Sequence, residues 1–130
     1  KGVSNGEGSR LRIKESLLEK NLFGIVSKDG STAEIFDTNF KFNDYQLSAY
    51  KKNWRYGKFG KIFVNHSNFY GLKNFFLSEG NSEILINNSI FEGDIIKKGN
   101  ITINKKIYEK NKYSNFFKVW NEIYYKWIDI

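Results

Sequence analysis

The only histidine of this chain, His66, lies in the stretch KFGKIFVNHSN, where an apolar run gives way to polar residues. An imidazole can take up and release a proton near neutral pH, which suits general acid or base catalysis. Arg55 and Lys61 precede it and could hold phosphate, while Ser67 and Tyr70 follow with hydroxyl groups. These residues predict metal-independent cleavage of RNA, with His66 transferring a proton.

Such cleavage needs one group to deprotonate the 2′-hydroxyl, another to protonate the leaving oxygen, and cations that stabilise the phosphorane. A lone histidine fills one of these roles, so its partner would be a carboxylate such as Glu79, a tyrosine or a lysine. The alternative interpretation is that His66 merely occupies the end of a strand.

Charge is concentrated around this stretch. The chain carries a net charge of +7, and residues 45–78 hold six cations without an acid. Trp54 and Tyr56 lie among them and could stack on unpaired bases. A local excess of positive charge attracts a polyanion through counterion release, so nucleic acid is the expected partner class. The cations are Lys51, Lys52, Arg55, Lys58, Lys61 and Lys73.

A metal-dependent nuclease is the main rival mechanism, because several carboxylates could supply a pair for Mg²⁺. They are Asp37, Asp44, Glu83, Glu92 and Asp94. No Glu-x-Lys or Asp-x-Lys signature follows Asp94, and the chain has no cysteine to bind a metal. We therefore expect neither a metal nor another cofactor.

The elements that would position these groups follow from capping residues, periodicity and turn pairs. We expect a flexible lead over residues 1–8 and one domain over 9–130. Helices are predicted over 9–21, over 44–53, from Ser67 to before Gly80, and from Ser114 onward, the last with an aromatic stripe. Strands are predicted over 22–28, 31–37, 61–65, 83–87, 89–97 and 100–108. Asp29-Gly30 and Lys98-Gly99 would close hairpins.

This order predicts an α+β domain that has an antiparallel sheet of about five or six strands, covered mainly on one face, with an N-terminal helix and a C-terminal amphipathic helix. The segment ILINNSIFEGDIIKKGNITINKK has the asparagine spacing of a solenoid turn. One such turn cannot bury its own core, so no internal repeat is expected. No apolar run is long enough to cross a membrane.

In format the chain resembles the C-terminal toxin domains of bacterial polymorphic toxins, especially contact-dependent growth-inhibition ribonucleases and colicin nucleases. The resemblance rests on the absence of an initiator methionine, the lead KGVSNGEGS, a small basic domain without cysteine, and NHS beside a basic and aromatic segment. It implies a barnase-like or colicin-nuclease-like fold.

The resemblance also implies secretion as part of a larger carrier protein, and cleavage of RNA, above all tRNA, in the cytoplasm of a recipient cell. An acidic cognate immunity protein would neutralise the domain, and a translation elongation factor is a further implied partner. Two alternatives remain open: a non-catalytic nucleic-acid-binding module that uses the same basic segment, and a domain whose basic face binds an acidic protein.

Overall fold

The structure, a computed structural model, describes residues 1–53, 55 and 58–104, and these residues form strands joined by turns. No α-helix occurs among them. The strands are β1 (Val3–Asn5), β2 (Arg10–Lys14), β3 (Leu17–Glu19), β4 (Phe23–Lys28), β5 (Thr32–Phe36), β6 (Asn39–Lys41), β7 (Tyr45–Tyr50), β8 (Lys61–Asn65), β9 (Asn68–Ser78), β10 (Glu83–Asn87), β11 (Ile90–Gly99) and β12 (Ile101–Asn104).

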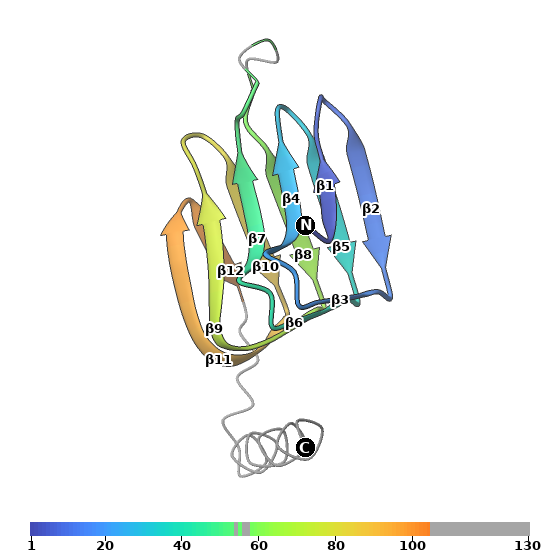
Figure 1. Ribbon diagram of the computed structural model, residues 1–130, viewed down its shortest axis with the longest axis vertical. Helices are drawn as coiled ribbons and strands as arrows, with labels where there is room; N and C mark the ends of the chain where they lie inside the picture. Colours follow the sequence, from blue (N-terminus) through green and yellow to red (C-terminus); the bar gives the residue numbers. More distant parts are fainter. Residues whose placement is uncertain (54, 56–57, 105–130) are drawn as a thin grey trace.

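All of these strands pair in parallel, in two sheets that face each other (Figure 1). One sheet has the order β12-β10-β8-β5-β2, and the other runs β1-β4-β7-β9-β6-β3 with β11 beside β9. The predicted antiparallel α+β fold is therefore wrong, and so is the barnase-like or colicin-nuclease-like fold that the resemblance implies. Asp29-Gly30 lies between β4 and β5, and Lys98-Gly99 ends β11 just before β12. Neither predicted hairpin forms, because each of these strands pairs with strands of other coils.

The pairing follows a repeat that was not predicted. Arg12 bonds to its strand partner Glu34, and the two are 22 residues apart. Ser67 and Ser89, in a later part of the chain, are bonded across the same interval of 22 residues. Because each turn of the chain lays its strands on those of the turn before, the fold is a parallel β-solenoid.

One coil of this solenoid consists of three short strands separated by corners. The first coil is β1, β2 and β3, and the second is β4, β5 and β6. In the third and fourth coils the last strand runs on into the next coil, which is why β9 pairs with β6 through residues 68–70 and with β7 through residues 76–78.

The core lies inside the coils and has a different composition on each side. Strands β5, β8 and β10 alternate, and they turn Ala33, Ile35, Ile62, Val64, Ile84 and Ile86 inward, all fully buried. Opposite them the rings of Phe40, Phe69 and Phe91 are stacked, with centroids 4.8 Å and 5.1 Å apart. The alternation of buried and outward residues along β5, β8 and β10 has the period of two that is expected of a strand with one buried face.

The corners between β2 and β3, β5 and β6, β8 and β9, and β10 and β11 share one conformation. Glu15, Asp37, His66 and Asn88 occupy them with φ between 46° and 48°. The next residue is always Ser or Thr, and these hydroxyls form a column: Thr38 N–H donates to Ser67 Oγ, and Ser67 N–H donates to Ser89 Oγ, both at 3.2 Å. The column satisfies backbone groups that the corners would otherwise leave buried and unpaired.

Several predicted elements are replaced by strands. The helix predicted over 9–21 is β2 and β3, the helix over 44–53 is β7, and the helix after Ser67 is β9. The lead expected over 1–8 contains β1. Strands at 61–65 and 83–87 are confirmed as β8 and β10. The helix predicted from Ser114 onward lies outside the described residues.

Candidate polyanion-binding corner

An insertion interrupts the repeat of the solenoid at the corner between β7 and β8. Thr38 and Ser67, bonded in the corner column across this insertion, are 29 residues apart, whereas Ser67 and Ser89 in the next step are 22 residues apart. The corner therefore holds seven extra residues. Residues 51–60 connect β7 to β8 in the sequence and include Lys51, Lys52, Arg55 and Lys58. This part of the predicted basic segment 45–78 is thus an added corner loop, here called the basic loop, that the repeat itself does not require.

The base of the basic loop is fixed by the carboxylate of Asp29, a residue of the preceding coil. Asp29 Oδ1 accepts the backbone N–H groups of Lys52 and Asn53, each at 2.8 Å. Asp29 as a whole residue is 2% exposed, and it has φ 54°, in the left-handed region that Asp tolerates better than most residues. Asn53 Oδ1 in turn accepts the N–H of Arg55 at 3.1 Å.

Electrostatics keep Asp29 ionised. Burial alone would raise the pKa of its carboxyl group, but other effects outweigh it. The N–H groups of Asn53 and Lys52 and the charges of Lys28 and Lys52 stabilise the carboxylate, so its pKa lies below the ordinary 3.8. A buried negative charge thus lies beneath the positive loop and offsets part of its charge.

Phe59 and Gly60, at the returning end of the loop, pack tightly on the solenoid. Gly60 lies so close to β4 that a Cβ atom there would collide with the carbonyl oxygen of Ser27. The ring of Phe59 packs against Gly80, where a Cβ would lie 2.5 Å from the ring, and Lys51 Nζ lies 5.6 Å from the ring centroid. Phe59 therefore joins the two halves of the loop to the next coil.

A hollow of about 460 Å³ opens beside the loop. Two cationic side chains, Lys58 and Lys61, line it together with hydroxyl, amide and aromatic groups. Both lysines are exposed, and ammonium groups beside hydroxyl and amide donors suit an oxyanion such as phosphate. The other lining residues are Gly30, Ser31, Thr32, Phe59 and Asn81.

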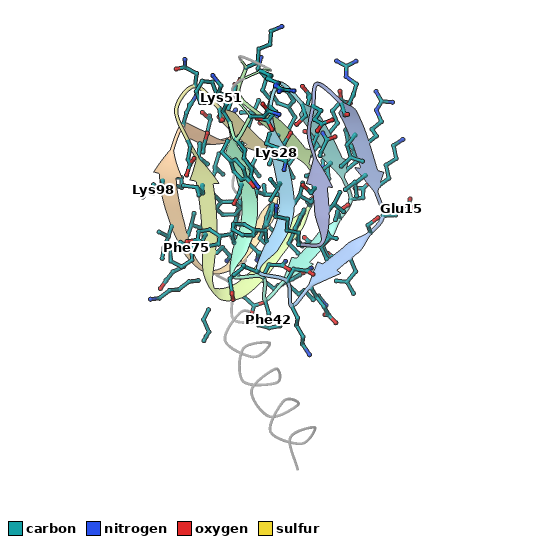
Figure 2. All side chains as sticks on the ribbon, turned by 45° about the horizontal axis from the view of Figure 1, so that its top comes forward. Glu15, Lys28, Phe42, Lys51, Phe75 and Lys98 are labelled. Atoms are coloured by element: carbon teal, nitrogen blue, oxygen red, sulfur yellow. The ribbon has the colours of Figure 1, made fainter. Side chains whose placement is uncertain are left out.

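His66 lies at a different corner from this hollow. Lys61 begins β8 and His66 follows its end, so the whole strand separates them, with about 13 Å between its first and last Cα atoms. Figure 2 labels Lys51 at the basic loop and Glu15, which shares the corner column of His66, at well-separated positions. The structure does not gather His66, Lys58 and Lys61 around one hollow.

The other predicted catalytic and binding residues are dispersed in the same way. Ser67 is fully buried in the hydroxyl column, where its Oγ donates to the carbonyl of Asn65 at 3.1 Å. Tyr70 is half-buried, with Lys41 Nζ 5.5 Å from its ring centroid. Lys73 lies beyond the next corner, beside Asp94 of the adjacent strand. Trp54 and Tyr56 lie outside the described residues.

The carboxylates weighed for a metal site are also spread over different coils and corners. Within residues 1–53, 55 and 58–104, no three His, Asp or Glu side chains form a group able to hold a metal ion. In the same part of the chain, no helix has the length and apolar character needed to cross a membrane.

Sequence reasoning missed Asp29, Thr32 and Asn81 as parts of this corner. Asp29 precedes the whole basic segment, and Asn81 follows the end of β9, so neither lies among the clustered cations. The signal that could have found them is the repeat, because strand pairing places Thr32 beside Lys61. Because of the insertion, these two residues are 29 positions apart, so a search for a strict repeat of 22 residues would miss their pairing.

Comparison of the chain with known protein families, with curated proteins and with solved structures finds no match.

Proposed function

We propose that this domain is a non-catalytic binding module for nucleic acid, in which the solenoid holds the basic loop and the phosphate backbone binds at the hollow beside it. Lys58 and Lys61 contact phosphate oxygens, and the remaining cations of the loop add attraction over a longer range. The observation that supports the proposal is the hollow itself, because it combines two exposed lysines with hydroxyl and amide groups beside a loop that is fixed at both ends.

The interruption of the repeat also favours a binding role. A solenoid corner needs only a few residues, as the short connections Asp29–Ser31 between β4 and β5 and Glu79–Ser82 between β9 and β10 illustrate. The corner between β7 and β8 is longer and concentrates Lys and Arg. An elaborated loop on a rigid scaffold is a common location for binding residues.

Ribonuclease activity stays a prediction. Its proton transfer depends on His66, and a general acid or base must come within about 3 Å of the proton it moves. The separation of His66 from the hollow offers no such arrangement around a phosphate bound there. The secreted carrier, the tRNA substrate, the recipient cell, the immunity protein and the elongation factor are likewise predictions that rest on the resemblance alone.

The test is a binding measurement with a variant that removes both lysines of the hollow, Lys58→Gln with Lys61→Gln. Fluorescence anisotropy with labelled single-stranded RNA should show at least about tenfold weaker binding for this variant, equivalent to about 1.4 kcal/mol. The matched control is Lys97→Gln with Lys98→Gln, which removes two exposed lysines from the edge strand β11, neither of which lines the hollow. Equal affinity of the two variants would contradict the proposal.

Gel analysis of the RNA recovered from the same mixtures, with and without a chelator, tests the prediction of cleavage. A pure binding module leaves the RNA intact in both. Cleavage that persists in excess chelator would instead support the ribonuclease prediction, whereas cleavage abolished by the chelator would support the metal-dependent alternative.

A further inference from the structure

A second group of cations lies on the outer face of the sheet that begins at β2. Leu11 and Ile13 pack against the core, so Arg10, Arg12 and Lys14 point outward from this edge strand. The side chains of Arg10 and Arg12 are 75% and 65% exposed. Sequence reasoning had placed these residues in a helix and gave them no function.

This basic edge is continuous with the hollow. Thr32 is the strand partner of both Arg10 and Lys61, and Thr32 and Lys61 both line the hollow. Two strand spacings, about 10 Å, therefore separate the backbone of Arg10 from that of Lys61. The cations of β2 and Lys61 of β8 thus flank β5, whose outward residues Thr32, Glu34 and Phe36 include no cation.

The acids on this face do not cancel its charge. Glu83 of the neighbouring strand β10 is the strand partner of Lys61. Glu34 is the one carboxylate among the outward residues of β2, β5 and β8, all of which the structure describes. It pairs with both arginines, at 3.1 Å from Arg12 Nε and 3.9 Å from Arg10 Nε. One carboxylate between two guanidinium groups leaves a net positive charge, and exposed ion pairs of this kind are weak.

Two aromatic rings on the same face favour nucleic acid over other polyanions. Phe36 and Phe63 alternate with core residues and lie half-buried on the outer face, and Lys14 Nζ is 5.9 Å from the ring centroid of Phe36. Aromatic rings among cations provide surfaces on which unpaired bases can stack.

We infer that a single-stranded nucleic acid bound at the hollow continues across this face and ends on the arginines of β2. The inference rests on the proposed function, because the hollow supplies the first contacts. It assigns Arg10 and Arg12 as phosphate-binding residues and makes affinity depend on the length of the strand.

The experiment compares a dinucleotide with single-stranded RNA of about 16 nucleotides, the upper site size of single-strand binding folds. The dinucleotide has one phosphate linkage, so it cannot contact the hollow and the arginines of β2 together. Wild type should bind the longer strand more tightly. Arg10→Gln with Arg12→Gln should bind the dinucleotide like wild type, and with the long strand the slope of log affinity against log salt should fall by about 1.4 for two lost contacts.

Three other outcomes have distinct meanings. Loss of binding to both lengths in Lys58→Gln with Lys61→Gln, together with wild-type behaviour of the arginine variant, would overturn this inference and leave the proposed function standing. No effect of the lysine variant would overturn both. If a sulfated polysaccharide of equal charge competes as well as the long RNA, this face recognises charge alone. That result would overturn the assignment to nucleic acid.

Discussion

The carboxylate of Asp29 accepts the backbone N–H of Asn53 at 2.8 Å, across 24 residues of sequence and from one coil of the solenoid to the next. The same oxygen accepts the N–H of Lys52. A charge-assisted hydrogen bond is about twice as strong as a neutral one, and here one buried acceptor holds two donors. The conformation of the basic loop thus depends on a residue that lies outside it.

Replacement of Asp29 by alanine should release the loop while leaving the solenoid folded. The change leaves two backbone N–H groups without their acceptor, at a cost of about 1–3 kcal/mol each if they stay buried. We expect the loop to open instead, which exposes the bonds after Lys51, Lys52 and Arg55 to trypsin. Limited proteolysis followed by mass spectrometry measures the rate of these cuts.

The matched control is Asp37→Ala. Asp37 is an exposed corner residue with φ 48°, so this change removes the same charge and imposes the same left-handed strain on alanine, but breaks no contact with the loop. Its loop should be cut no faster than that of the wild type. Equal acceleration in both variants would show that general destabilisation, and not the loss of the Asp29 contacts, opens the loop.

The pH dependence of stability should carry the signature of the same carboxylate. The pKa of Asp29 is lower in the folded chain than its ordinary value of 3.8, so the folded state favours the ionised form. The resulting stabilisation is present above pH 3.8 and is lost as the pH falls through the folded pKa. Asp29→Asn removes this contribution, so urea midpoints of wild type and variant should differ at neutral pH and converge at a pH below the folded pKa.

A control variant is needed for this experiment, because other carboxyl groups also become protonated in the same pH range. The Asp37→Asn variant provides it, since this exposed side chain has no buried donors that depend on its charge. Its difference from wild type should be small at both pH values. A constant difference for Asp29→Asn across the whole range would contradict the role of its charge.

The stacked rings inside the solenoid should dominate its stability. Phe69 lies between Phe40 and Phe91 with interplanar angles of 12°, and it meets the edge of Phe76 at 5.1 Å. Phe69→Ala should destabilise the domain by about 3–5 kcal/mol, measured by urea unfolding. Leu72→Ala is the control, because Leu72 is 77% exposed, and it should change stability by about 0.5 kcal/mol or less.

How far the sequence predicts this fold can be judged from particular elements. Residues 61–65 and 83–87 are short apolar runs with a polar residue at each end, and both strands were predicted with their correct bounds. Residues 10–14 do alternate apolar and polar side chains, but Ser9 resembles a helix cap and the leucines that follow match a helical spacing, so the sequence predicts a helix where β2 lies. Local patterns of this length do not decide between the two structures.

The repeat was hidden for a physical reason. It applies to backbone pairing, whereas the side chains in equivalent positions need only share size or hydrogen-bonding capacity, as Leu18 and Phe40 do. The insertion then displaces every later residue from the register of the first coils. In the candidate site, local charge predicts Lys58 and Lys61. Asp29 and Arg10 belong to other coils, and only the hydrogen bonds and strand pairing of the folded chain relate them to the site.

His66 offers a final test that separates its conformational role from a catalytic one. It has φ 48° at the corner that Asn88 occupies in the next coil with the same φ. Alanine at this position would add left-handed strain, so loss of activity in His66→Ala could come from altered folding. Asparagine tolerates this conformation and has no group that titrates near neutral pH. His66→Asn should therefore unfold at the same urea concentration as wild type and bind single-stranded RNA with the same affinity.

If wild type cleaves RNA in excess chelator and the folded His66→Asn variant does not, the imidazole acts in catalysis and the proposal of a non-catalytic module fails. If neither protein cleaves RNA while both bind it, the role of His66 is structural: it occupies a corner that requires a positive φ. The second result is expected, because the corner column explains the position of His66 without any reaction.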